Sequence, residues 1–235
     1  MIKAIAITPV KDSILTTLET IKAIANSNCK VKHIVYNDFS TDTTKKALED
    51  AVDTYGFELI NLEDITTHPS PNYRLVLQNA QQIALKENLP LIIVESDVII
   101  KNDTLEKMID YGKQDHIGMV GAITVDENEK VNFPYLKFKN ESRPIISTKR
   151  SLSFCCTLLT HDLLKAYSFQ NLNDSKDWYD VFISNKSIEL GFENYLLIKT
   201  PVLHKPHGSR PWKLLKYKNP IKYYFQKFLN KRDKI

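Results

Sequence analysis

The stretch LIIVESD, residues 91–97, decides the fold. Its first four residues form the most apolar short run in the chain, as expected for a central parallel strand that helices cover on both faces. Glu95 and Asp97 follow directly, with Ser96 between them. Charged side chains at the end of a buried strand are costly unless they are paired or bind a metal ion. The stretch therefore predicts a helix-covered sheet with a polar site at the end of its central strand.

Segments on both sides of this run alternate between strand-like and helix-like patterns. The strand-like segments are residues 3–8, 32–36, 57–61 and 91–95. Helical periodicity is found at residues 13–26, 42–55 and 74–87, and again from Asp103 onward. Such alternation implies a mostly parallel α/β sheet with right-handed crossovers, and these sheets bind ligands beyond the carboxyl ends of their strands.

The second half of the chain is less regular. Residues 151–160 and 195–199 favour strands, and residues 180–190 favour a helix. There is no internal repeat and no convincing linker, so we expect residues 1–211 to form a single domain.

Composition is typical of a soluble globular protein, with 43% hydrophobic and 26% charged residues among 235. No run approaches the roughly 20 apolar residues of a membrane-spanning helix, and the first residues lack the pattern of a secretory signal. Cys29, Cys155 and Cys156 form no even disulfide framework. We interpret them as reduced core thiols of a cytoplasmic protein.

The positive charge is concentrated at the carboxyl end. Residues 212–235 carry eight Lys or Arg against one Asp, so this tail is +7 and the rest of the chain is −3 within a net charge of +4. Aromatic residues are interleaved with the basic ones. This mixture suits the headgroup region of an anionic membrane, which is the favoured interpretation. Packing of the aromatic residues on the domain is the closest alternative, and binding to nucleic acid is the weakest.

Two strand ends carry groups suited to a nucleotide diphosphate. The motif NDFSTD, residues 37–42, lies between a strand and a helix, where the carboxylate of Asp38 could accept a hydrogen bond from a pyrimidine ring N–H. An ordinary turn with an Asp cap is the alternative. Glu95 and Asp97 offer the hard oxygen ligands that a divalent cation on a diphosphate needs.

Two later motifs could complete a catalytic site. Asp180 opens a predicted helix, where it could remove a proton from an attacking hydroxyl, although a helix cap is the simpler interpretation. His204 begins the motif HKPHGS after the last predicted strand, and imidazole is a frequent ligand of transition metals such as Mn²⁺.

In this order and spacing, the motifs resemble those of family 2 glycosyltransferases of the GT-A fold, over about residues 3–209. The resemblance rests on Thr8-Pro9-Val10, NDFSTD, Gln78-Asn79, Glu95-Ser96-Asp97, and Asp180 eleven residues before Gly191. It implies a Rossmann-like three-layer sandwich, followed here by the basic aromatic tail. Departures from the family pattern are Asn37, Phe39, Lys11-Asp12, Glu95 and Tyr179.

The resemblance also implies roles for single residues. Asp180 would be the general base, and Asp97 and His204 would bind Mn²⁺ or Mg²⁺. The nucleotide-sugar donor would be held by Thr8, Pro9, Asp38, Arg74, Glu95 and Ser96.

The implied activity is metal-dependent, inverting transfer of a sugar to a glycan or lipid-linked acceptor in cell-surface glycan synthesis, from a donor for which UDP or dTDP is favoured. A sugar nucleotidyltransferase is less favoured because it needs a glycine-rich loop after the first strand, and residues 8–15 contain no glycine. A binding protein without turnover is the third possibility. The sugar, the linkage and the oligomeric state stay open.

Overall fold

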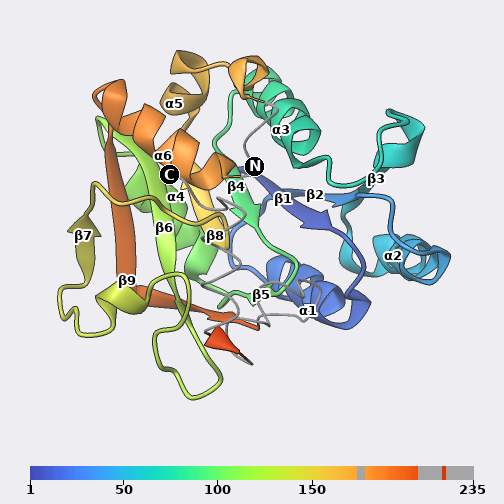
Figure 1. Cartoon of the computed structure of the whole chain (residues 1–235), viewed down its shortest axis with the longest axis horizontal. Coiled ribbons are helices and arrows are strands. Elements are labelled where there is room, and N and C mark those ends of the chain that lie inside the picture. The colour runs from blue at the N-terminus through green and yellow to red at the C-terminus, as the bar shows by residue number, and fades with distance from the viewer. Residues whose placement is uncertain (174–177, 206–218, 221–235) are drawn as a thin grey trace. The chain divides into compact units, whose positions relative to one another are not determined.

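The structure is a computed structural model that describes residues 1–173, 178–205 and 219–220 (Figure 1). A sheet of nine described strands has the order β3-β2-β1-β4-β8-β6-β9-β5, and β7 pairs with β9. The strands are β1 (Ile5–Val10), β2 (Lys32–Asn37), β3 (Glu58–Asn61), β4 (Leu91–Val94), β5 (Val98–Ile99), β6 (Ile117–Val125), β7 (Ile145–Ser147), β8 (Cys156–Leu159) and β9 (Glu193–His204).

The first half of the sheet follows the prediction. Strands β1 to β4 begin and end within two residues of the predicted segments, and β1 pairs in parallel with both β2 and β4. Helices join them in the predicted places: α1 (Ile14–Ala25), α2 (Asp42–Tyr55) and α3 (Tyr73–Glu87), with α4 (Thr104–Gly112) after β4. The carboxyl ends of β1, β2 and β4 therefore lie at one edge of the sheet.

The second half differs from the prediction in several elements. Strand β6 was not predicted, although eight of its nine residues are buried. Strand β8 is shorter than predicted and runs antiparallel to both β4 and β6, whereas β9 is longer and runs parallel to β6. The helix predicted at residues 180–190 is confirmed as α6 (Tyr179–Glu189), and α5 (His161–Ala166) was not predicted.

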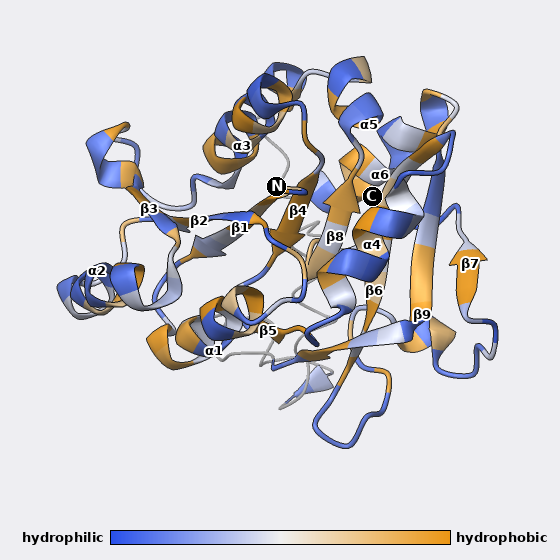
Figure 2. Ribbon diagram, turned by 180° about the vertical axis from the view of Figure 1, so that it is seen from behind, coloured by the Kyte–Doolittle hydropathy of each residue, from blue (hydrophilic) through white to orange (hydrophobic). Residues whose placement is uncertain are grey.

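Helices cover both faces of the sheet, and the strand periodicity divides the core between them. In β1, Ile5 and Ile7 join the cluster that also contains residues of α3, α5 and α6. The alternating residues Ala4 and Ala6 join the cluster that contains residues of α1 and α4. Figure 2 shows the apolar strands between helices whose outer surfaces are hydrophilic. The predicted three-layer α/β fold is confirmed.

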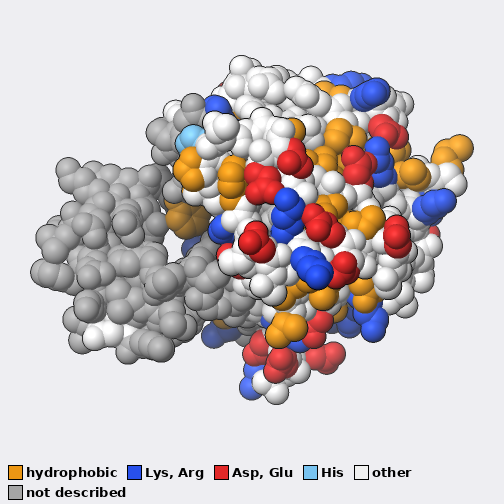
Figure 3. Space-filling view, turned by 90° about the vertical axis from the view of Figure 1, so that its right-hand side faces the viewer, with side chains coloured by type: hydrophobic (Ala, Val, Ile, Leu, Met, Phe, Trp, Pro, Cys, Tyr) orange, Lys and Arg blue, Asp and Glu red, His pale blue; other side chains and the backbone are white. Residues whose placement is uncertain are grey.

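The edge strand β3 is bordered by mixed charges. Glu58 lies 3.5 Å from Lys32, and Lys45 pairs with Glu63. Acidic and basic side chains intermingle over this side of the protein (Figure 3). Charged side chains along an edge discourage pairing with another strand. No helix in the described part of the chain is long and apolar enough to cross a membrane.

Residues 1–205 form one compact unit. The tail predicted at residues 212–235 lies almost wholly outside the described residues, so the boundary after residue 211 stays a prediction.

Candidate donor and metal site

The register of β4 and β8 brings Cys155 beside Glu95. These strands are antiparallel, with Val94 opposite Cys156, and the Glu95 amide donates to the Cys155 carbonyl at 3.0 Å. The Cys155 thiol donates to Glu95 Oε2 at 3.4 Å. Two residues that are 60 positions apart in sequence are thus joined through both main chain and side chain.

The register of β5 and β9 brings His204 beside Asp97 in the same way. Val98 is opposite His204, and the Lys205 amide donates to the Asp97 carbonyl at 2.8 Å. The imidazole Nε2 of His204 lies 3.6 Å from Asp97 Oδ2, and both residues are buried. The two residues predicted to bind a metal ion are therefore neighbours, although their role as ligands stays a prediction.

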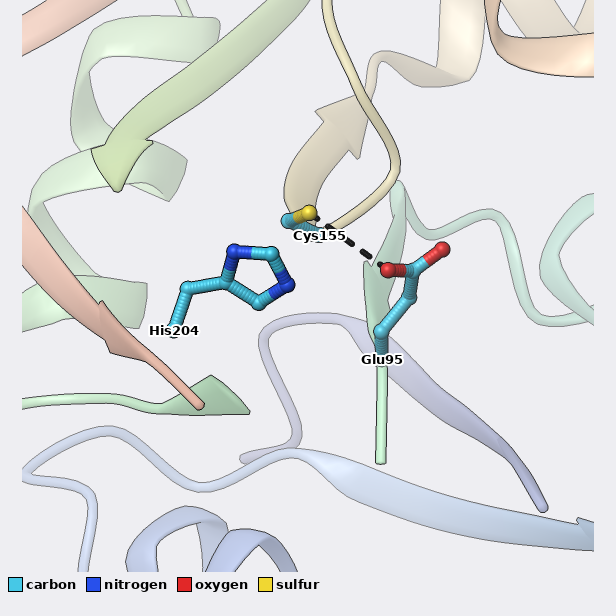
Figure 4. A group of neighbouring side chains, drawn as sticks. All are labelled: Glu95, Cys155 and His204. Carbon is cyan, nitrogen blue, oxygen red and sulfur yellow. Dashed lines mark hydrogen bonds between the residues drawn. The ribbon is translucent and has the colours of Figure 1, made fainter. Parts of the chain in front are cut away.

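These two contacts form one cluster at the end of β4. One ligand atom from each of Glu95, Cys155 and His204 lies within 4.8 Å of the others. Figure 4 shows the His204 ring pointing toward Glu95 and Cys155. Carboxylate oxygens and an imidazole nitrogen are ligands that suit Mn²⁺, so the side chains that are present fit a divalent cation.

The orientation of His204 is fixed by its other ring nitrogen. Nδ1 lies 2.8 Å from the Phe133 carbonyl, and a carbonyl can only accept, so Nδ1 carries a proton and donates. Burial lowers the pKa of His204, but the Asp97 carboxylate, the Phe133 carbonyl and the Glu95 charge together raise it, and the net pKa is above the usual value. Without a metal ion the ring and Asp97 therefore favour an ion pair, and a cation would replace the proton on Nε2.

A hydrogen bond from Asn132 holds the carboxyl end of β9, where His204 lies. The Asn132 side-chain amide donates to the His204 carbonyl at 3.1 Å. Its oxygen is buried and has no hydrogen-bond partner among the described residues. Buried acceptors without a partner are uncommon in folded proteins, and a ligand or ordered water can complete their bonding.

Asp38 is held by the loop before α3. Its Oδ2 accepts from the Ser70 hydroxyl at 2.8 Å and from the Asn72 amide at 2.9 Å, and its Oδ1 accepts from Asn72 Nδ2 at 2.8 Å. The carboxylate, which is 9% exposed, therefore fixes this loop against the end of β2. The contact between Asp38 and a nucleotide base stays a prediction. A base bound there would share the carboxylate oxygens with these three hydrogen bonds.

The remaining predicted donor contacts are distributed along the same sheet edge. Thr8 is fully buried, and its hydroxyl lies 3.0 Å from His33 Nε2. Burial lowers the pKa of His33 to about 3, so this ring is neutral. Pro9 is half-buried in β1, Ser96 is buried, and Arg74 donates to the Leu172 carbonyl at 3.2 Å. The donor-binding roles of these residues stay predictions.

Asp180 is half-buried in the first turn of α6, where its Oδ1 accepts from the Val181 amide at 2.8 Å. Burial raises the pKa of Tyr135, and the nearby charges of Cys155 and Asp180 raise it further. Tyr135 also contacts the chain segment that leads to Cys155. The Tyr135 hydroxyl accepts from the Ser153 amide at 3.0 Å.

A hydrogen bond links α6 to the segment that ends at Cys155. The Leu152 amide donates to the Ser184 hydroxyl at 2.9 Å, one helical turn after Asp180. The segment from Leu152 to Cys155 thus runs from the helix to Glu95.

Sequence reasoning did not place Cys155 or Tyr135 in the site. All three cysteines are buried and free, in agreement with the interpretation as core thiols. Only the register of β8 reveals that one of them faces the acids, and that register has no local signal in the sequence.

A sequence profile described as Glycosyl transferase family 2 matches residues 5–167. No curated protein sequence matches the chain significantly. Several solved structures have a similar fold. One is the mannosyltransferase PcManGT from Pyrobaculum calidifontis in complex with GDP-Man and Mn²⁺, with a TM-score of 0.65, 14% identity and coverage of 96% of this chain and 64% of that one.

Two further structures have the same fold at low identity. TarS residues 1–349 from S. aureus in complex with UDP-GlcNAc has a TM-score of 0.65 and 19% identity, with coverage of 88% of this chain and 60% of that one. GalNAc-T7 with UDP, GalNAc and Mn²⁺ has a TM-score of 0.63 and 10% identity, with coverage of 87% and 44%. The chain thus spans less than two thirds of the length of each of these proteins. Because the family profile covers more than half of the chain, the protein belongs to glycosyl transferase family 2.

Proposed function

We propose that the protein is an inverting, metal-dependent glycosyltransferase that moves a sugar from a nucleoside diphosphate to an acceptor hydroxyl. The observation that carries this proposal is the position of His204 at the carboxyl end of β4, where it lies near both Asp97 and Glu95. Residues from distant parts of the chain thus place a buried imidazole beside one buried and one half-buried acid. In an α/β sheet this is the edge where ligands bind.

Asp97 and His204, with Glu95 beside them, would hold Mn²⁺ or Mg²⁺. When bound, the ion offsets the negative charge that develops on the departing diphosphate. The imidazole favours Mn²⁺ over Mg²⁺, which prefers oxygen ligands and retains water. PcManGT and GalNAc-T7 were both solved with Mn²⁺, which supports the same choice here.

Asp180 would act as the general base. Its carboxylate takes the proton of the acceptor hydroxyl while the hydroxyl oxygen bonds to the anomeric carbon from the face opposite the diphosphate. The bond between that carbon and the phosphate oxygen breaks, and its electron pair leaves with the nucleoside diphosphate. A single displacement of this kind inverts the configuration at the anomeric carbon.

The donor would lie along the ends of β1, β2 and β4. Thr8 and Asp38 would contact the nucleotide base, and Arg74 would make a further contact to the nucleotide. Pro9 and Ser96 would also contact the donor. A UDP- or dTDP-linked sugar is favoured, and the complex of TarS with UDP-GlcNAc supports a uridine nucleotide. The GDP-Man complex of PcManGT is a reason to include guanosine donors in any screen.

We further propose a cytoplasmic role in cell-surface glycan synthesis on a glycan or lipid-linked acceptor, at an anionic membrane reached through residues 212–235. The support is the excess of basic residues in this segment. Deletion of the segment should abolish co-sedimentation with vesicles of phosphatidylglycerol at low salt. Equal pelleting of the shortened and full-length proteins would exclude the membrane role.

The activity can be tested with a panel of nucleotide sugars. Each is screened with and without Mn²⁺ for thermal stabilisation, since a ligand that binds only the folded state raises the melting temperature. The donor that stabilises the protein is then assayed for transfer. We expect Asp97→Ala to lose the metal-dependent stabilisation.

The general base is tested with the same donor. Asp180→Asn should retain donor binding and lower kcat by roughly 10²-fold or more. Asp162→Asn is the matched control, because Asp162 is an exposed acid in the first turn of α5. Unchanged turnover in Asp180→Asn would remove this residue from the role, and binding without turnover in the wild type would identify a binding protein.

A further inference from the structure

Cys155 adds a sulfur atom to the cluster of polar side chains at the end of β4. Its sulfur lies 3.4 Å from Glu95 Oε2, and ligand atoms of Cys155, Glu95 and His204 lie within 4.8 Å of one another. In a tetrahedral site with bonds of ~2.0 Å to nitrogen or oxygen and ~2.3 Å to sulfur, neighbouring ligand atoms are roughly 3.3–3.8 Å apart. The cluster is therefore close to the size of a metal site before any ion binds.

The three side chains belong to a rigid part of the fold. Glu95 and Cys155 are joined across the β4–β8 pair by a main-chain hydrogen bond of 3.0 Å. His204 ends β9, which pairs with β5, and its Nδ1 is bonded to the Phe133 carbonyl at 2.8 Å. A site that is held in this way loses little conformational entropy when the ion binds.

The cysteines differ in their surroundings. All three belong to one apolar cluster, but the Cys156 sulfur lies 3.6 Å from Met108 Sδ and the Cys29 sulfur 3.7 Å from the Ser27 hydroxyl, so neither of these contacts is with an acid. Cys155 directly precedes β8, and its thiol, unlike that of Cys156, donates to Glu95 Oε2. Cys155 is thus the member of the three that reaches the acidic end of β4, and the others provide matched controls.

The chemistry of the ligand set determines which ions it prefers. Sulfur, imidazole nitrogen and carboxylate oxygen together are typical of Zn²⁺, whereas Mg²⁺ prefers oxygen ligands alone. From the geometry of this cluster we propose that Cys155 is a thiolate ligand of the metal site, with Glu95 and His204, and that the site binds thiophilic divalent ions such as Zn²⁺, Co²⁺ and Cd²⁺ more tightly than Mg²⁺.

Binding replaces the thiol proton, which passes to solvent, and no electrons are transferred. The proposal extends the metal site of the proposed function. It predicts that a thiophilic ion competes with Mn²⁺ at this site.

The test uses the full-length protein and Co²⁺ as the probe. Wild-type protein should develop a sulfur-to-cobalt charge-transfer band in the near ultraviolet at one equivalent of Co²⁺. Cys155→Ser should lose the band, and Cys156→Ser and Cys29→Ser should keep it. In a competition titration with a chelator dye, Cys155→Ser should bind Zn²⁺ at least ~10-fold more weakly, the scale on which changes in a metal site reduce affinity. The affinity for Mg²⁺ should change much less.

A measurement on the wild type alone guards against misfolding of the serine variant. The ¹¹³Cd NMR resonance of the cadmium-loaded protein should lie downfield, in the range of sites with a sulfur ligand. A resonance in the range of all-oxygen or oxygen and nitrogen sites would overturn the proposal, as would a cobalt band that persists in a folded Cys155→Ser protein.

The outcomes also separate this inference from the proposed function. Transfer with Mn²⁺ together with an absent sulfur band would refute the thiolate ligand and leave the transferase intact. A sulfur band in a protein that transfers no sugar with any metal ion would support the ligand and count against the transferase.

Discussion

Replacement of Asp38 by asparagine should loosen the loop that precedes α3. The carboxylate accepts three hydrogen bonds: two on Oδ2, from Ser70 and the Asn72 amide, and one on Oδ1, from Asn72 Nδ2. The asparagine variant keeps one acceptor oxygen, which can serve the first two donors. Its NH₂ group then faces Asn72 Nδ2, and two donors oppose each other. Rotation of the Asn72 amide would relieve this contact but break its bond to the His68 carbonyl at 3.0 Å.

One buried hydrogen bond is therefore lost whichever way the amides turn. Leaving a buried donor unpaired costs about 1–3 kcal/mol. For a chain of this size each kcal/mol lowers the melting temperature by roughly 2–4 °C. Asp38→Ala removes both acceptor oxygens and so all three hydrogen bonds, and it should be more destabilising than Asp38→Asn.

Urea unfolding followed by circular dichroism measures the effect. Asp42→Asn is the control, because Asp42 is an exposed acid in the same motif, at the first residue of α2, and its loss should cost at most about 1 kcal/mol. Equal midpoints for the Asp38→Asn and Asp42→Asn proteins would refute the structural role of the Asp38 carboxylate. If Asp38 also contacts the nucleotide base, Asp38→Asn should raise KM for the donor more than Ser70→Ala does.

Three further predictions concern the core. Burial lowers the pKa of His33 to about 3 in the folded protein. In the unfolded chain the pKa of this histidine is near ~6.5, so below that pH the unfolded chain binds more protons than the folded one. His33 should therefore lower the free energy of unfolding by about 1.4 kcal/mol per pH unit as the pH falls from ~6.5 toward 3. His33→Asn should show a shallower loss in urea titrations between pH 7 and 4.5, and parallel curves would contradict this. Gly118→Ala should destabilise by about 1–3 kcal/mol, because the added carbon would lie 2.0 Å from Ser187 Oγ and 2.8 Å from Phe192 Cβ. Gly112→Ala should cost less, since its closest neighbour at 2.9 Å is the mobile end of Leu158; the reverse order of melting temperatures would refute the packing argument.

The local patterns predicted the first half of the fold because each element there carries its own signal. A short window of sequence is enough to recognise the apolar run at Leu91–Val94 and each helical periodicity around it. The alternation of strands and helices then implies parallel strands. Strand β6 escaped prediction although it is almost wholly buried. Its sequence, IGMVGAITV, contains two glycines, which weaken strand propensity, and a fully buried strand shows no alternation.

The candidate site was only partly predictable for a related reason. Asp97 and His204 could be named from motif spacing, and the structure places their side chains 3.6 Å apart. The position of Cys155 depends on the antiparallel direction of β8, which is set by long-range packing. No pattern within residues 151–160 distinguishes the cysteine that faces Glu95 from the one that faces Met108.

The main-chain pairing around Glu95 and Asp97 has a consequence for how sites of this kind diversify. Hydrogen bonds from the Glu95 amide to Cys155 and from the Lys205 amide to Asp97 use backbone atoms alone, so they do not depend on which side chains occupy the pairs. A different side chain at position 155 or 204 would therefore be placed at the same point by the same main-chain hydrogen bonds. Under the proposed metal role, changing one or two of these side chains would alter the preferred ion while the main-chain pairing stays the same.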